Sequence, residues 1–165
     1  MKTEKRRRRQ GKTDYKARLS LLKSGKPRIV FRKTNNYILG QYVKSKEAQD
    51  KVEMGVASSQ LLKYGWPKES SGSLKSLPAA YLTGLLLGKK ILDKEDNAKA
   101  ILDIGLLRNI KKSRVYAFVK GLKDAGVEIP CNEKMFPDEL RLAGRHMKKS
   151  IEFEKIKLKI NKKNG

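Results

Sequence analysis

The stretch Arg28-Ile-Val-Phe-Arg-Lys-Thr-Asn-Asn-Tyr-Ile-Leu-Gly-Gln-Tyr-Val (28–43) is where the hydrophobic period of the chain changes from about 3.6 residues to about 2. In an extended chain, Ile29 and Phe31 fall on one side. The residues on the other side are Arg28, Val30 and Arg32. The Thr-Asn-Asn triplet at 34–36 favours a turn, and residues 37–43 are expected to return as a second strand.

A third strand is expected directly after this hairpin. In residues 52–57, Val52, Met54 and Val56 alternate with the residues between them, which are Glu53, Gly55 and Ala57. Three strands in series suggest an antiparallel meander, and one face of it should be polar and cationic. Such a face leaves an open sheet surface or loop edge available for binding.

Helices and strands alternate in the rest of the chain. A short helical piece is expected over 58–64, followed by a loop over 65–77 that is rich in Ser, Gly and Pro. The next helix, 78–92, can begin at a proline and is apolar nearly all round, so it should pack against the sheet. Within it, Gly84 and Gly88 lie four residues apart and would let another element approach closely.

Residues 100–104 are nearly all apolar, as expected of a short strand covered on both faces. Ser113 should cap a helix that ends at Gly126, an extended piece should follow over 127–130, and a last helix should run from Asp138 to about Lys148. The element order predicts an α/β fold with a mixed sheet. A three-strand meander followed by alternating helices and strands is also similar to the ribonuclease-H-like architecture.

Upstream of the hairpin, the chain predicts one short amphipathic helix. Tyr15, Leu19 and Leu22 follow a capping Thr13 or Asp14 at helical spacing. This helix could dock on the body by one side and offer cations by the other. The cations are Lys12, Lys16, Arg18 and Lys23.

The net charge of +23 over 165 residues points to a polyanionic partner, with nucleic acid as the first candidate. The charge is concentrated at the ends, because residues 1–33 carry +12 and residues 148–165 carry +5. The run Arg6–Arg9 buries nothing apolar, so we expect a disordered arm unless a partner orders it. A solvated tail or a localisation signal is the alternative for this run.

These observations divide the chain into a basic arm and helix (1–26), an α/β RNA-binding domain (27–147) and a basic tail (148–165). The tail is compatible with a charged helix, a strand or a docking segment, and the pattern does not choose among them.

Several classes of protein are not expected. The longest apolar stretch, 79–87, is far shorter than the ~20 residues of a membrane-spanning helix. The N-terminus lacks the apolar region of a secretory signal, so a cytoplasmic protein without a membrane partner is expected. One cysteine, Cys131, allows no disulfide within the chain, and with His146 it is too little for a zinc site. The segment from Gly84 to Lys90 lacks the spacing of a phosphate-binding loop. We expect no cofactor.

A nuclease is the catalytic alternative, because basic proteins that hold RNA could also cut it. Two-metal hydrolysis needs several convergent carboxylates. Only Asp103 is well placed, and it could equally accept hydrogen bonds from the backbone of its own loop. We therefore expect no enzyme activity.

Seven segments together resemble the archaeal and eukaryotic branch of the ribosomal protein L-eighteen family, whose eukaryotic members are called L-five. The resemblance covers about residues 6–147 in unbroken order. The segments are RRRRQGKTDY (6–15), RLSLLKSGKPR (18–28), RKTNNYI (32–38), LKYGW (62–66), PAAYLTGLLLG (78–88), LDIGL (102–106) and DAGVEIP (124–130).

The resemblance implies a non-catalytic protein of the large ribosomal subunit in the cytoplasm, with a ribonuclease-H-like topology. It implies binding of 5S ribosomal RNA (5S rRNA) and its anchoring in the central protuberance, with large-subunit rRNA and neighbouring ribosomal proteins as further partners. The chain departs from the family at 107–112, where a Pro- and Gly-containing loop is usual, and at Cys131, where relatives often have His.

The residues expected to contact RNA combine cations for phosphates with amides and rings for unpaired bases. They are Arg6, Arg7, Arg8, Arg9, Lys12, Tyr15, Lys16, Arg18, Arg28, Arg32, Lys33, Asn35, Asn36 and Tyr37. For both tyrosines, half-buried packing is an equal alternative to stacking, and for Trp66 packing is the expectation. A general nucleic-acid chaperone or DNA-compacting protein would use the same cations without a preferred target.

Overall fold

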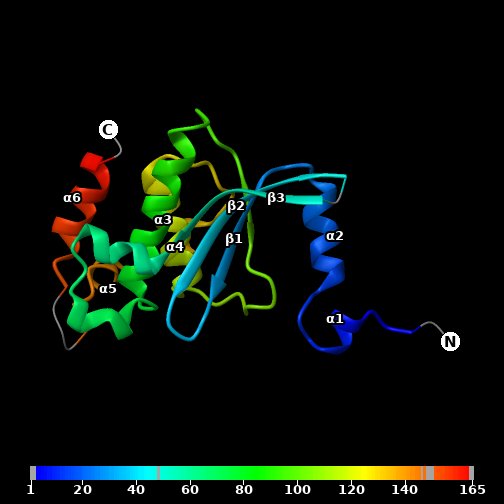
Figure 1. The fold of residues 1–165 in the computed structure, drawn as a ribbon, viewed down its shortest axis with the longest axis horizontal. Coiled ribbons are helices and arrows are strands. Elements are labelled where there is room, and N and C mark those ends of the chain that lie inside the picture. Colours follow the sequence, from blue (N-terminus) through cyan, green and yellow to red (C-terminus); the bar gives the residue numbers. More distant parts are fainter. Residues whose placement is uncertain (1–2, 48, 146, 148–150, 164–165) are drawn as a thin grey trace.

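A computed structural model describes residues 3–47, 49–145, 147 and 151–163 (Figure 1). Four strands form one sheet in the order β3-β2-β1-β4. They are β1 (Arg28–Lys33), β2 (Ile38–Lys46), β3 (Gln49–Ala57) and β4 (Ile101–Asp103). The first three strands pair antiparallel, and β4 pairs parallel with β1. The predicted α/β class, the meander and the mixed sheet are confirmed, while the ribonuclease-H-like topology stays a prediction.

The helices lie mainly on one side of this sheet. The α-helices are α1 (Arg6–Arg9), α2 (Tyr15–Lys23), α3 (Leu77–Leu92), α4 (Arg114–Ala125), α5 (Glu139–Leu142) and α6 (Phe153–Lys163). The 3₁₀ helices are η1 (Ser58–Tyr64), η2 (Lys68–Ser73) and η3 (Glu133–Met135). In Figure 1, α3 and α4 cover one face of the sheet, α5 and α6 lie beyond them, and α2 stands on the opposite side. None of the described helices is long and apolar enough to span a membrane.

The period-2 pattern of β1 has the predicted consequence. Ile29 and Phe31 are fully buried, and the Phe31 ring packs on Phe118 of α4 with ring centroids 5.1 Å apart. Gly40 on β2 makes room for the same ring, because a Cβ at this position would lie 2.6 Å from a Phe118 ring carbon. The apolar face of the hairpin is therefore the face that receives the helices.

A β-bulge corrects the prediction for the third strand. Tyr42 pairs with Met54, but its neighbour Val43 pairs with Val52, so Glu53 is an extra residue in β3. Each extra residue moves the following side chains to the other face of a sheet. Val52 consequently lies opposite to Met54 and is 50% exposed, although the three valine and methionine positions alternate regularly in the sequence.

Helices α3 and α4 touch backbone to backbone. A Cβ on Gly84 would lie 2.1 Å from the carbonyl oxygen of Phe118, and a Cβ on Gly121 would lie 2.1 Å from that of Tyr81. The close approach predicted from Gly84 and Gly88 is confirmed, with Gly88 against Ala125. The helix begins at Leu77, one residue before the predicted start, and is buried almost all round.

Four local predictions have mixed outcomes. Strand β4 is an edge strand whose first two residues are only half-buried, so its predicted cover on both faces is wrong. The extended piece at 127–130 is confirmed, since Glu128 exchanges backbone hydrogen bonds with Ala98 and Ala100. Ser113 is the N-cap of α4, but its buried hydroxyl makes no hydrogen bond to the described residues. Helix α5 ends at Leu142 rather than near 148, and residues 146 and 148–150 lie outside the described residues.

The C-terminal segment is a helix that packs on the body. Ile151, Phe153, Ile156 and Ile160 are buried, and the Phe153 ring lies 5.4 Å from that of Tyr81 on α3. Of the three conformations that the sequence left open, the structure has the helix, because Phe153, Ile156 and Ile160 lie on one face when residues 153–163 are helical.

We expect the substitution Gly84→Ala to lower the free energy of unfolding by about 2 kcal/mol or more, because a methyl group cannot fit against the carbonyl of Phe118 without separating the helices. Chemical denaturation measures this change. Gly72→Ala is the control, since a Cβ there meets nothing within 4 Å. Equal losses in the two variants would contradict the close contact.

Candidate nucleic-acid interface

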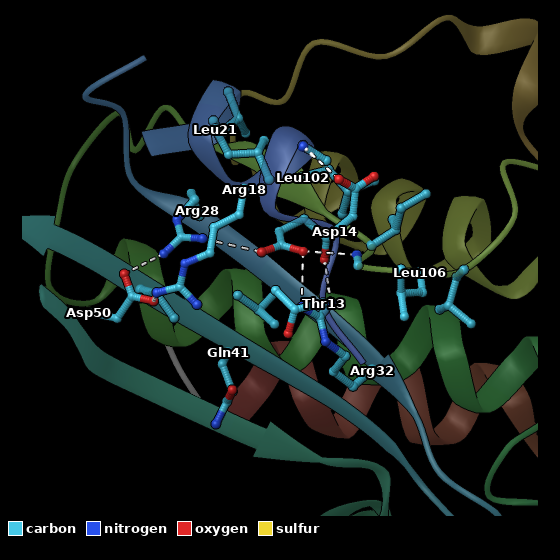
Figure 2. Close-up of a pocket in the computed structure, with 18 of the residues that line it drawn as sticks. Thr13, Asp14, Arg18, Leu21, Arg28, Arg32, Gln41, Asp50, Leu102 and Leu106 are labelled. Atoms are coloured by element: carbon cyan, nitrogen blue, oxygen red, sulfur yellow. Dashed lines mark hydrogen bonds and ion pairs between the residues drawn. The ribbon is translucent and has the colours of Figure 1, made fainter. Parts of the chain in front are cut away.

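A groove with a cavity volume of about 910 Å³ lies between α2 and the face of the sheet that α3 and α4 leave open (Figure 2). Its floor includes Val30 and Val43, and one wall is the segment 101–107 that contains β4. Cationic side chains line it as well. They are Arg7, Lys12, Arg18, Arg28, Arg32 and Lys33. The cationic face predicted for the sheet is therefore a hollowed surface.

Helix α2 begins where the sequence predicts. The Asp14 carboxylate accepts hydrogen bonds from the backbone N–H groups of Lys16 and Ala17, at 2.9 and 3.1 Å. No residue of α2 is buried, and Leu19 is 54% exposed. The helix is expected to dock on the body by one side, and its contact with the sheet is an ion pair rather than a set of buried apolar side chains. Nη2 of Arg18 donates to Oδ2 of Asp50 on β3 at 2.9 Å.

The arginine run forms the single turn α1 and is fully exposed. Two contacts connect the arm to the start of α2, namely Arg7 with the Thr13 hydroxyl and Lys5 over the Tyr15 ring, and Arg8 pairs with Glu4 within the arm. The expected absence of regular structure is therefore not observed, because local contacts partly offset the repulsion between the arginines.

Arg28 occupies a different position from the one expected of an RNA contact. Its side chain is only 3% exposed and lies between two carboxylates, Asp50 at 2.5 Å and Asp103 at 3.2 Å. Its Nη2 also donates to the Ser45 hydroxyl at 3.0 Å. A guanidinium enclosed in this way is not available to a phosphate, so we leave Arg28 out of the proposed interface.

Two arginines donate hydrogen bonds to the carboxylate of Asp103, one to each oxygen. Its Oδ2 accepts from Arg28, and its Oδ1 accepts from Nη2 of Arg32 at 3.0 Å and from the Gly105 N–H at 2.9 Å. The hydrogen bond to its own loop is the non-catalytic alternative that the sequence allowed. No group of three or more His, Cys, Asp or Glu side chains that could hold a metal occurs in the described part of the chain.

Burial by itself would raise the pKa of Asp50. Hydrogen bonds from Ser45 and Arg28, together with the charges of Arg28 and Arg18, outweigh this effect and hold the pKa of Asp50 below its ordinary value. Asp50 therefore stays ionised well into the acid range and keeps both arginines paired.

The turn between β1 and β2 presents the remaining expected contacts. Lys33, Asn35, Asn36 and Tyr37 are exposed, with Tyr37 at 40%. The Thr34 hydroxyl fixes the turn by accepting from the Tyr37 N–H at 2.9 Å.

The structure does not bring all the expected residues together. Arg7, Lys12, Arg18, Arg32 and Lys33 line the groove, as do the neighbouring Asp50 and Asp103. The turn with Asn35, Asn36 and Tyr37 lies at the opposite end of β1 from the pair between Arg18 and Asp50. Lys16 is exposed on α2 without lining the groove.

One basic residue beside the turn, Lys75, is not among the RNA contacts predicted from the sequence. Nζ of Lys75 donates to the carbonyl oxygen of Asn35 at 2.8 Å, across 40 positions of sequence. Nothing in the loop sequence around Lys75 indicates this proximity.

Trp66, in the same loop region, is buried and donates its indole N–H to the Ser70 carbonyl, which confirms the prediction of packing. Cys131 is half-buried, and burial raises the pKa of its thiol.

Comparison with known proteins gives consistent results. The family described as "Ribosomal large subunit proteins 60S L5, and 50S L18" matches residues 1–100. Large ribosomal subunit protein uL18 of Korarchaeum cryptofilum is 48% identical over 146 residues, which cover 88% of this chain and 72% of that protein. The uL18 proteins of Methanococcus maripaludis (48% over 147 residues, 89% and 74% covered) and Methanoculleus marisnigri (47% over 142 residues, 86% and 78% covered) are similar to the same extent.

We expect Asp50→Asn to lower the free energy of unfolding by about 1 kcal/mol at pH 7, the size of a partly exposed charged hydrogen bond. The pKa of Asp50 is lower in the folded state, so this stabilisation is present above the unfolded-state pKa and is lost as pH falls through the folded-state value. In urea titrations, the difference between the two proteins should therefore shrink as the pH falls below about 4, the ordinary pKa of an aspartate. A difference that stays constant from pH 7 through the acid range would contradict the ion pairing.

Proposed function

Because this chain belongs to the family of ribosomal large-subunit proteins 60S L5 and 50S L18, we propose that it binds 5S rRNA and attaches it to the central protuberance. The predicted family membership is confirmed. As a member, the chain is a structural constituent of the large subunit rather than an enzyme, and it has its place in the cytoplasmic ribosome with rRNA and ribosomal proteins as partners.

The observation that carries the proposal is the gathering of cations on one side of the molecule. Helix α1, helix α2 and the open face of the sheet lie together at one end, away from α5 and α6 (Figure 1). This end holds most of the charge of residues 1–33, which carry fourteen basic and two acidic side chains. A surface of this kind attracts a polyanion.

The chemistry of the exposed residues suits folded RNA. The deep major groove of an RNA helix is poorly accessible to side chains, so proteins contact phosphates, 2′-hydroxyl groups and unpaired bases. Arginine guanidinium groups bind phosphate through two parallel hydrogen bonds and also stack on bases. In the proposed interface, Arg6–Arg9, Lys12 and Lys16 contact phosphates along one path.

The turn between β1 and β2 supplies the other kind of contact. The amides of Asn35 and Asn36 can donate to and accept from base edges, and the Tyr37 ring can stack on one unpaired base. We propose that residues 1–26 and this turn hold the RNA, while the α/β domain over 27–147 is the scaffold that fixes their separation. The role of residues 148–165 toward RNA is left out of the proposal.

We expect the affinity for 5S rRNA to fall steeply with salt. If about six phosphates are neutralised, the plot of log K against log salt has a slope of roughly −4 to −5. A filter-binding titration between about 50 and about 200 mM KCl gives this slope. A slope near zero would contradict the electrostatic mechanism.

The same assay separates a specific RNA-binding protein from a general nucleic-acid chaperone. Excess duplex DNA should leave the complex with 5S rRNA intact if the RNA is recognised by its shape. Displacement by an equal mass of DNA would favour the chaperone.

We expect a variant in which all four arginines at 6–9 are replaced by Gln to bind 5S rRNA at least about tenfold more weakly. The slope of log K against log salt should become about 3 units shallower. The midpoint of unfolding should not change, since none of the four side chains is buried. A matched control removes four exposed lysines elsewhere, namely Lys99, Lys134, Lys155 and Lys162. If both variants lose the same affinity, the arm has no special role.

A further inference from the structure

Five charged side chains alternate in sign across the open face of the sheet. Arg18 pairs with Asp50, Asp50 with Arg28, Arg28 with Asp103, and Asp103 with Arg32, at distances from 2.5 to 3.2 Å. We call these five residues the arginine relay. It connects α2, β3, β1 and β4, and Figure 2 shows Arg18, Arg28 and Asp50 side by side beneath α2.

The two ends of the relay differ from its centre in exposure. The Arg28 side chain is 3% exposed, whereas those of Arg18 and Arg32 are 44% and 43% exposed. Both end residues line the groove. In the relay, Arg28 is therefore buried, whereas Arg18 and Arg32 are partly exposed. Each of these two outer arginines pairs with a carboxylate that also pairs with Arg28.

The environment of Arg32 is built around its guanidinium group. Nη1 donates to the carbonyl oxygens of Phe31 and Asp103, at 2.8 and 2.9 Å, and Nη2 donates to the Asp103 carboxylate. Gly105 adopts a positive φ of +60°, and a Cβ there would lie 3.0 Å from Cζ of Arg32. The absence of a side chain at 105 thus leaves room for the guanidinium plane. Three of its five N–H donors are used in these bonds, which leaves donors for a ligand.

On the premise that the chain binds 5S rRNA, we propose that Asp50 and Asp103 are positioning residues that hold Arg18 and Arg32 as two fixed guanidinium forks for RNA phosphates at the groove. Arg28 links the two carboxylates and sets the separation of the forks. A long side chain that is already ordered loses less conformational freedom on binding than a free one. The carboxylates thus support RNA binding although their charge repels phosphate.

Positioning by a carboxylate and simple electrostatics predict opposite changes in RNA affinity when the carboxylate is replaced by an amide. A carboxylate within a cationic RNA-binding surface lowers the local potential, so its replacement by an amide should tighten RNA binding. If the carboxylate positions an arginine, the same replacement should weaken binding, because the arginine is then free to move. The direction of the change therefore distinguishes the two effects.

The experiment measures binding of 5S rRNA to the full chain and to the variants Asp50→Asn, Asp103→Asn and Glu139→Gln at one salt concentration. All three substitutions remove one negative charge. Glu139 is the control, because its side chain on α5 is 93% exposed and lies at the other end of the molecule. We expect about tenfold weaker binding for each aspartate variant, which corresponds to about 1.4 kcal/mol, and unchanged or slightly tighter binding for the control.

A double-variant comparison separates positioning from an effect on the fold. If Asp50 acts through Arg18, then adding Asp50→Asn to Arg18→Gln should cause no further loss of affinity. An equal loss in both backgrounds would overturn the proposal, since Asp50 would then act independently of Arg18. Thermal melts establish that each variant is folded at the assay temperature. Should Asp103→Asn not fold, the Asp50 comparison decides, because that side chain is 30% exposed.

The outcomes distinguish this proposal from its premise. If the unmodified chain does not bind 5S rRNA, the proposed function fails and the positioning proposal fails with it. If the unmodified chain binds and folded aspartate variants bind as tightly as Glu139→Gln, the positioning proposal alone is overturned.

Discussion

The backbone contact between α3 and α4 is the constraint on which the rest of the structure depends. Gly84 and Gly121 each lack the Cβ that would collide with a carbonyl of the other helix, so the two helices form one thin layer. This layer covers a single face of the four-stranded sheet, where Ile29 and Phe31 point. Among the described residues, α2 is the one helix that stands over the second face.

A charged side chain that is buried on the open face of the sheet needs partners of opposite charge. Arg28 lies on this face and is buried, so an isolated guanidinium there would be costly. Asp50 and Asp103 supply the compensation from the β2–β3 hairpin and from β4, and each also holds an outer arginine. The same network therefore joins the edge strand, the hairpin and the N-terminal helix, and its members line the groove.

The position of Asp103 shows why a carboxylate on a strand is weak grounds for catalysis. In the sequence it is the one acid well placed for metal-assisted hydrolysis, because it lies within the nearly all-apolar run at 100–104. In the structure, two arginines and the Gly105 N–H occupy its oxygens. A metal would have to displace these partners, and membership of a family of structural ribosomal proteins accounts for the residue without chemistry.

The sequence by itself determined the features that depend on neighbours along the chain. These are the hairpin of β1 and β2, the end of α3 at Leu92, the C-terminal glycine of α4 and the concentration of positive charge at the N-terminal end. Period, capping residues and charge are local properties, so they can be recognised without a structure. Only the tertiary structure decided that Val52 changes face at a bulge, that the C-terminal segment is a helix, and that Arg28 faces two carboxylates instead of solvent. Each of these depends on a partner that is distant in sequence, and Asp103 lies 75 positions from Arg28. The charge of a side chain follows from its amino-acid type, whereas its availability to a ligand depends on the residues that the fold places beside it.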